Sequence, residues 1–319
     1  MKKLFLVFVL FLTACAAPAQ RVALPTQSAP IPARMLFPLY VYPGANGAAW
    51  QPVVNANAYQ NIDAIVNPAN GPGLNKSVNY TNGINKLRAA NVGLYGYVYT
   101  SYGDRPIAAA KADVDRWLSW YAPLKGIFLD EAEYRDYQND QAYYAELLFY
   151  INGKGLRVIN NPGTGTTETY AGLADTTCIF ESEVTRSFTF PSWGWNYPAS
   201  KFCYLSHSAN VEQMRAAVAM AKTNNIEYVY ITNVSSGDYW ASIPPYLAEE
   251  AQLLSGGIIP LPPSTSTVTL TPTKTATPTV TMIPSLTPLA PPTVTKTPTA
   301  TPTALCVPAL DVWVCDKKP

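Results

Sequence analysis

Short apolar runs recur along the middle of the chain, separated by segments whose apolar residues have helical spacing. The runs are rich in β-branched and aromatic residues and predict eight strands, at residues 36–42, 62–67, 94–100, 126–130, 156–160, 176–181, 201–207 and 228–232. Helices are predicted between them, for example at residues 80–91, 108–122, 141–153 and 211–225. Strand and helix therefore alternate from about residue 35 to residue 256.

Eight strand–helix units in one block predict an α/β fold, the (β/α)8 or TIM barrel, whose usual size is about 250 residues. A doubly wound open sheet is the alternative arrangement. It is disfavoured because neither GxGxxG nor GxxxxGK[ST] follows the first strand. We therefore expect one barrel domain at residues 35–256, with its active site at the carboxyl ends of the strands.

The N-terminus has the features of an export signal followed by a spacer. Two lysines precede the run LFLVFVLFL, which is too short to span a membrane and has the length of a signal-peptide core. The next residues, LTAC, resemble a bacterial lipobox and predict a lipoprotein signal peptide at residues 1–14, with a lipid on Cys15. An ordinary signal peptide with a chance cysteine is the alternative. Residues 15–34 would form a spacer, and the lipid would anchor the protein to the bacterial cell membrane, outside the cytoplasm and facing outward.

The C-terminal part differs from the barrel block in composition. Residues 257–305 are dominated by threonine and proline, with too few large apolar side chains to form a core, so they are predicted to be a disordered linker or stalk. An O-glycosylated stalk and an inert tail both fit this composition. Residues 306–319 are too short for a domain, and the spacing of Cys306 and Cys315 suggests a small loop closed by a disulfide.

Composition limits the chemistry and the partners of this protein. Lys and Arg number 22 against 21 Asp and Glu, so the chain has no basic surplus for binding nucleic acid. Only 13% of residues are charged whereas Tyr numbers 21 and Trp 7, which favours an uncharged or weakly charged ligand. His207 is the only histidine, which argues against multi-histidine metal sites. We expect no metal, no cofactor and a monomer.

Three acidic residues at predicted strand ends are the candidate catalytic residues. Asp130 ends the fourth strand and is followed by Glu131, and Glu181 ends the sixth. Because side chains alternate across a strand, Asp130 and Phe128 would face the barrel interior, and Glu131 would diverge unless the chain leaves strand geometry there. An exposed loop cap or a salt bridge to Arg135 is the structural alternative for the Asp130–Glu131 pair.

Glu181 would give Asp130 a catalytic partner from two strands around the barrel. Backbones two strands apart are separated by about 9 to 10 Å. Inward-leaning carboxylates could then be about 5 Å apart, as in retaining glycosidases, or about 7 to 9 Å, as in inverting ones. Mutual repulsion should raise the pKa of at least one carboxyl group. The structural alternative for Glu181 is an ion pair with Arg186 or Lys201.

Polar and aromatic residues near the strand ends are candidate substrate-binding residues: Tyr42, Asn67, Thr100, Tyr102, Arg105, Asn161, Trp193, Trp195 and His207. The proline after Asn67 and Asn161 favours an extended conformation for each Asn, although Asn and Pro are also common in ordinary turns. Trp193 and Trp195 offer flat apolar faces with a polar group, which suits a pyranose ring, although barrel packing can use the same residues. A structural role is the alternative for His207.

Several of these segments together resemble one family. PLYVYPG (38–44), IVNPANGPG (65–73), GYVYTSYGDR (96–105), GIFLDE (126–131), NPGT (161–164) and FE (180–181) occur in the order seen in the spherulin 4-like family, glycoside hydrolase family 135. The resemblance covers the barrel and excludes the signal, stalk and tail. It implies a (β/α)8 barrel that cleaves α-1,4-linked N-acetylgalactosamine in galactosaminogalactan-type exopolysaccharide. The family's acids correspond to Asp130 as nucleophile or stabiliser, Glu181 as acid/base and Glu131 as a supporting residue.

Residues and resemblance together predict a surface-anchored glycoside hydrolase, similar to endo-α-1,4-N-acetylgalactosaminidases, whose partner is a galactosamine-containing polysaccharide. A non-catalytic, lipid-anchored carbohydrate-binding envelope protein is the alternative, and the three acids argue for the enzyme. A polysaccharide deacetylase usually needs histidine metal ligands that this chain lacks.

Overall fold

The computed structural model describes residues 33–135, 138–256, 306–309 and 312–315. The predicted signal peptide, lipid attachment at Cys15 and Thr/Pro-rich segment lie outside these residues, as does the spacer apart from its last two positions. The chain divides into two units, residues 1–262 and 263–319. No helix in the described ranges is long and apolar enough to cross a membrane.

Eight parallel strands close into a barrel in the first unit, in chain order, with β1 paired to β8. They are β1 (Arg34–Leu39), β2 (Asp63–Val66), β3 (Gly93–Tyr99), β4 (Gly126–Asp130), β5 (Arg157–Asn161), β6 (Thr176–Glu183), β7 (Phe202–His207) and β8 (Tyr228–Ile231). Each predicted strand is confirmed, with ends that differ by three residues at most. The (β/α)8 prediction is correct, and the open sheet is excluded.

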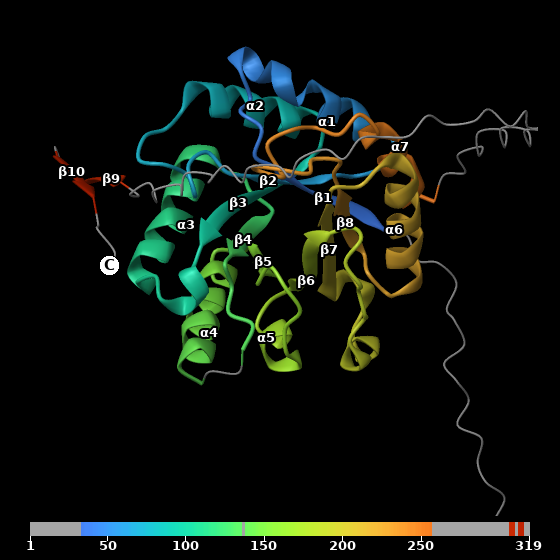
Figure 1. Cartoon of the computed structure of the whole chain (residues 1–319). Helices are drawn as coiled ribbons and strands as arrows, with labels where there is room; N and C mark the ends of the chain where they lie inside the picture. Colours follow the sequence, from blue (N-terminus) through green and yellow to red (C-terminus); the bar gives the residue numbers. More distant parts are fainter. Residues whose placement is uncertain (1–32, 136–137, 257–305, 310–311, 316–319) are drawn as a thin grey trace, which may run out of the picture. The chain divides into compact units, whose positions relative to one another are not determined.

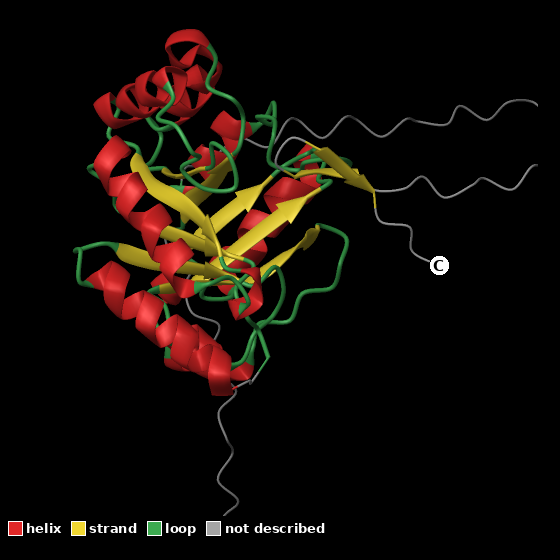
Figure 2. Cartoon of the chain, turned by 90° about the vertical axis from the view of Figure 1, so that its left-hand side faces the viewer, coloured by secondary structure: helices red, strands yellow, loops and turns green. Residues whose placement is uncertain are grey.

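Helices pack on the outside of the strands (Figure 1; Figure 2). They are α1 (Gln51–Ala56), α2 (Val78–Ala89), α3 (Ile107–Tyr121), α4 (Gln138–Asn152), α5 (Glu168–Gly172), α6 (Val211–Thr223) and α7 (Leu247–Leu254), with short 3-10 turns η1 (Ala45–Trp50), η2 (Ser101–Gly103), η3 (Ser192–Asn196) and η4 (Ala199–Lys201). Local sequence fixes where some of them begin. Asn210 and Gln213 form a reciprocal capping box at the start of α6, which satisfies two backbone N–H groups there.

Aromatic side chains fill much of the barrel interior. The Phe37 ring stacks on the Tyr230 ring with centroids 4.3 Å apart, and the Tyr97 and Phe128 rings are in contact at 6.2 Å. Each pair joins neighbouring strands, β1 with β8 and β3 with β4. The interior is therefore a packed core that supports the side chains at the mouth from below.

The connection between β6 and β7 contains only the short turns η3 and η4 between residues 184 and 201. Aromatic rings cover the barrel at this position instead of a longer helix. Phe190 and Trp193 both contact Phe202, the first residue of β7. This irregular connection contains Trp193 and Trp195, two of the predicted binding residues.

The second unit contains an antiparallel pair of strands, β9 (Cys306–Ala309) and β10 (Val312–Cys315). The backbone register places Cys306 opposite Cys315. The disulfide between them stays a prediction.

Candidate active site

Asp130 lies at the carboxyl end of β4 and is held by two side-chain donors. The Tyr97 hydroxyl donates to Oδ2 at 2.7 Å, and the Asn161 amide donates to Oδ1 at 2.8 Å. Since the ring of Phe128, two residues earlier, lies in the interior against Tyr97, the predicted inward orientation of Asp130 and Phe128 is confirmed. Burial raises the pKa of Asp130, and the hydrogen bonds from Tyr97, the Glu131 backbone and Asn161 oppose this rise.

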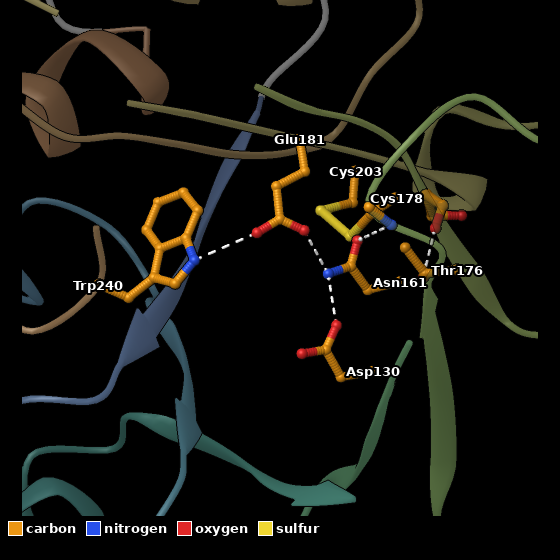
Figure 3. The surroundings of a disulfide bond; sticks show 9 residues. Asp130, Asn161, Thr176, Cys178, Glu181, Cys203 and Trp240 are labelled. Carbon is orange, nitrogen blue, oxygen red and sulfur yellow. Dashed lines mark hydrogen bonds between the residues drawn. A yellow bond between two sulfur atoms is a disulfide. The ribbon is translucent and has the colours of Figure 1, made fainter. Parts of the chain in front are cut away.

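Asn161 connects Asp130 to Glu181 (Figure 3). Its Nδ2 atom donates to Asp130 Oδ1 at 2.8 Å and to Glu181 Oε2 at 2.5 Å, while its Oδ1 atom accepts from the Gly163 N–H. The Gly163 bond fixes the direction of the amide. Because one nitrogen atom binds both carboxylates, their nearest oxygen atoms are at most about 5.3 Å apart, the sum of the two distances.

Glu181 receives a second hydrogen bond, from Trp240 Nε1 to Oε1 at 3.2 Å. Burial is the largest cause of a rise in the pKa of Glu181 to about 7, and the charge of Asp130 is the next. The expected rise in one carboxyl pKa is confirmed, but burial contributes more than the predicted mutual repulsion. Neither Arg186 nor Lys201 forms an ion pair with Glu181 in the described residues, and Lys201 donates instead to the Ala174 carbonyl.

A β-bulge in β6 sets the direction of Glu181. The pairing with β7 matches Cys178 to Cys203 and then Phe180 to Tyr204, which leaves Ile179 as an extra residue. In a regular strand, positions 178 and 181 would face opposite sides because their separation is odd. The extra residue restores them to one face, so that Glu181 lies on the same side as the buried Cys178 side chain.

A disulfide joins Cys178 to Cys203 on the amino-terminal side of this bulge (Figure 3). Both residues are fully buried. The cross-link attaches β6 to β7 immediately before the residue at which the strand pairing shifts. It therefore restrains the segment that carries Glu181.

Removing this disulfide should lower the free energy of unfolding. A cross-link spanning 25 residues restricts the unfolded chain by an amount worth about 3 kcal/mol, so Cys178→Ala/Cys203→Ala is expected to lose about that much in a urea titration. The reduced wild-type protein is the control that separates the cross-link from the packing of the two sulfur atoms. A loss well below about 1 kcal/mol in both samples would contradict the prediction.

Glu131 turns away from β4 because the chain leaves strand geometry there. Its φ angle is +50°, in the left-handed region, and its Oε2 atom accepts a hydrogen bond from Ser101 Oγ at 3.3 Å. This is the departure that the sequence required if Glu131 was to bend over the rim. The alternative was a salt bridge from the Asp130–Glu131 pair to Arg135, but within the described ranges the acid that Arg135 pairs with is Glu133.

Two predicted binding residues from the segment after β3 have structural contacts instead. Thr100 is fully buried, and its hydroxyl contacts the carbonyls of Asp130 and Glu131 at 3.1 and 2.8 Å. Arg105 pairs with Asp113 on α3 and donates to the Tyr99 carbonyl. We therefore correct both assignments: Thr100 holds the backbone of the acidic pair, and Arg105 attaches the loop to α3.

Trp193 and Trp195 do not lie with the acids. Trp193 packs on Phe202 at the beginning of β7, and Trp195 packs on Phe190, whereas the acids lie near the carboxyl ends of their strands. Phe202 precedes the inward-facing Cys203, so it points to the outside of the barrel. The predicted role of this Trp pair in the same site is therefore corrected: the pair covers the barrel where the β6–β7 connection lacks a longer helix.

The remaining predicted binding residues lie around the rim. Tyr42 is 56% exposed, and its hydroxyl accepts from Asn79 on α2. Asn67 accepts from the Gly71 N–H and so stabilises its own loop, which is the turn role considered as its alternative.

Tyr102 and His207 lie on opposite sides of the acids. Tyr102 is 41% exposed; burial of part of its ring raises its pKa, and the charge of Glu131 adds to that rise. The His207 ring stacks on Tyr239 with centroids 3.7 Å apart, and burial lowers its pKa.

Trp240 is a site residue that the sequence analysis missed. It follows β8 in the segment SSGDYW and reaches the carboxylate of Glu181. Applying the strand-end rule to the eighth strand would have included this segment, because a barrel mouth is formed by all eight connections. Tyr97 lies in the predicted third strand, but its direct bond to Asp130 depends on the register of β3 and β4. No group of three or more His, Cys, Asp or Glu side chains in the described ranges is arranged to hold a metal ion.

Comparison with known proteins finds a matching family and two similar proteins. Residues 34–254 match the model of the spherulation-specific family 4, Spherulin4. Spherulin-4 of Physarum polycephalum is 35% identical over 244 residues, which cover 71% of this chain and 70% of that protein. The crystal structure of Aspergillus clavatus Sph3 in complex with GalNAc has a TM-score of 0.61 and 25% identity, covering 71% of this chain and 98% of that one. The chain therefore belongs to the spherulation-specific family 4.

Proposed function

We propose that this protein is a glycoside hydrolase that cleaves a galactosamine-containing polysaccharide. The observation that carries the proposal is the shared amide of Asn161, which holds the carboxylates of Asp130 and Glu181 next to each other at the barrel mouth. Glycosidases use such a pair on either side of the bond to be cleaved. The two carboxyl groups also differ in their surroundings, which suits two different roles.

The spacing of the carboxylates supports a retaining mechanism. Retaining glycosidases have carboxyl groups about 5 to 5.5 Å apart, whereas inverting enzymes leave room for a water molecule between theirs. The limit of about 5.3 Å between the nearest oxygens of Asp130 and Glu181 fits the first class. Sequence considerations alone left both spacings open.

The roles follow from the donors around each group. Glu181 has a pKa of about 7, so it carries a proton in mildly acidic solution and can give it to the leaving oxygen as the glycosidic bond breaks. Asp130 accepts hydrogen bonds that favour its ionised form, and it can attack the anomeric carbon to form a glycosyl ester. Glu181, now ionised, then takes a proton from water as the water displaces Asp130.

The sugar assignment rests on the relative with a bound ligand. Aspergillus clavatus Sph3 was crystallised with GalNAc and shares this barrel over 71% of the present chain. The exposed ring of Tyr102 and the stacked pair of His207 and Tyr239 provide flat surfaces near the acids that suit a sugar ring. A carbohydrate-binding protein without turnover is the second candidate, and the raised pKa of Glu181 favours the enzyme.

The direct test is to incubate the purified protein with α-1,4-linked N-acetylgalactosamine polymer and to measure new reducing ends. Chitin oligomers and an α-glucan of similar length serve as controls for linkage and sugar. We expect reducing ends from the galactosamine polymer alone, and NMR of the first product should show retained α configuration. Binding of the polymer without any new reducing ends would support the carbohydrate-binding alternative.

A further inference from the structure

A cavity of about 240 Å³ lies at the end of β6, between the loop after β5 and the segment after β6. It is lined by Gly163, Thr164, Gly165, Ile179, Phe180, Glu181, Ser182, Arg186, Ser187, Phe188 and Thr189. This volume is smaller than the pockets that hold drug-sized ligands, and it suits a single sugar unit. None of the roles assigned above uses the cavity beyond Glu181.

The cavity adjoins the carboxylate of Glu181. Glu181 is one of its lining residues, and a Cβ atom built on Gly163, another lining residue, would lie 3.9 Å from Glu181 Oε2. Gly163 has a φ angle of +68°, and Gly165 has open space around the position of a Cβ. These glycines let the loop pass beside Glu181 without filling the space. A sugar in the cavity would therefore be next to the unit whose bond is cleaved.

The lining is rich in hydrogen-bond donors and has one cation. Arg186 is the only basic residue and Glu181 the only acid among the described residues that line the cavity. Arg186 is exposed, and it has no ion pair within the described ranges. Further hydroxyl groups come from Thr164, Ser182, Ser187 and Thr189. Phe188 adds an apolar wall, where its ring packs edge-on against Phe180 at 5.4 Å.

We propose that this cavity is a sugar subsite next to the cleavage point and that it takes a sugar unit bearing a carboxylate, with Arg186 as its partner. The proposal rests on the function proposed above and specifies its substrate as a polymer in which an acidic unit adjoins the cleaved galactosamine. A guanidinium group binds a carboxylate through two parallel hydrogen bonds, whereas it repels the ammonium group of a free amino sugar. The apolar wall would contact the face of the ring.

Binding of monosaccharides tests the subsite without requiring turnover. Galacturonate carries its carboxylate on the ring, and N-succinylgalactosamine carries it on the nitrogen substituent. Comparing the binding of these two sugars therefore shows which position of the carboxylate Arg186 recognises. We expect at least one of them to bind wild type about tenfold more tightly than Arg186→Gln, and N-acetylgalactosamine to bind both equally, in titration calorimetry. Arg186→Glu should bind neither acid.

Lys76→Gln is the matched control, since Lys76 is exposed in the loop before α2, four strands around the barrel from β6. It should bind the acids as wild type does. Equal binding of both acids by wild type and Arg186→Gln, or no binding of either acid by wild type, would overturn the proposal.

Turnover separates this proposal from the proposed function. A partly deacetylated galactosamine polymer can be used in three forms: with free amines, after acetylation and after succinylation. The backbone is the same in all three, and its side groups are positive, neutral and negative respectively. We expect kcat/KM to be higher for the succinylated than for the free-amine form in wild type, with this preference lost in Arg186→Gln. If no form is cleaved, the proposed function fails while the binding measurements still decide the subsite. If all forms are cleaved with the same kcat/KM and neither acid binds through Arg186, the subsite proposal fails and the proposed function stands.

Discussion

Asp130→Asn and Glu181→Gln are each expected to reduce kcat by about 10³-fold or more, while the protein keeps its fold and much of its affinity for the polysaccharide. Each substitution keeps the size of the side chain and removes the charge or the proton that the reaction needs. Asp130 is the proposed nucleophile and Glu181 the proposed acid, so neither can replace the other. Reducing-end assays and calorimetry on the same samples measure turnover and affinity.

Substrates with activated leaving groups distinguish the two roles. A dinitrophenyl glycoside needs little protonation to lose its phenolate. Glu181→Gln should therefore regain much of the rate of the first step, formation of the glycosyl ester, with this substrate. Asp130→Gly should not recover in this way, but added azide can occupy the space of the missing carboxylate and attack the sugar from the same side. The product would then be a glycosyl azide of inverted configuration.

Glu183→Gln is a suitable control because Glu183 is exposed on the same strand as Glu181. It should retain nearly full activity. Wild-type activity in either acid variant, measured with correctly folded protein, would exclude the carboxylate pair as the catalytic residues.

The barrel and the positions of the two acids could be predicted because they depend on local patterns. Parallel strands that are buried on both faces appear in the sequence as apolar runs. In a closed barrel, the carboxyl ends of these strands must all lie at the same end of the barrel. Asp130 and Glu181 follow from these two facts. In contrast, the position of each remaining side chain depends on where the chain leaves regular geometry.

The bulge at Ile179 shows this limit clearly. The strand containing Glu181 was predicted, but its register depends on the pairing with β7, which no residue of β6 reveals alone. Without the extra residue, Glu181 and Cys178 would face opposite sides, and only one of them could point inward. The inward direction of Glu181 therefore depends on a feature that sequence periodicity does not show.

The loop residues show a second limit. Ser101 and Tyr102 both have positive φ angles, +47° and +54°, which turn the segment after β3. Thr100, just before this turn, donates to the backbone of the acidic pair, and Arg105, just after it, reaches Asp113 on α3. Positive φ at residues other than glycine is uncommon and has no firm sequence signal, so these orientations could not be predicted.

The free energy of unfolding should decrease as the pH rises from about 4.5 to about 7, and Glu181→Gln should remove much of this decrease. Burial raises the pKa of Glu181 from 4.5 to about 7 in the folded protein. Between these values the folded state binds a proton that the unfolded state has released, so each step upward in pH favours unfolding. The stability that the folded state gains from keeping Glu181 neutral is fully present below about pH 4.5 and is lost as the pH passes about 7. At 1.36 kcal/mol for each pKa unit, the loss is about 3 kcal/mol.

Urea titrations of wild type and Glu181→Gln at several pH values between 4 and 8 measure this effect. The variant has no carboxyl group to ionise at this position, so its stability relative to wild type should increase with pH and become constant above about 7. Glu183→Gln, which removes an exposed carboxylate two residues away, should follow the wild-type curve. Parallel curves for wild type and Glu181→Gln would show that Glu181 has the same pKa in the folded and unfolded states. The proposed acid would then be ionised in mildly acidic solution and would lack the proton that the leaving oxygen requires.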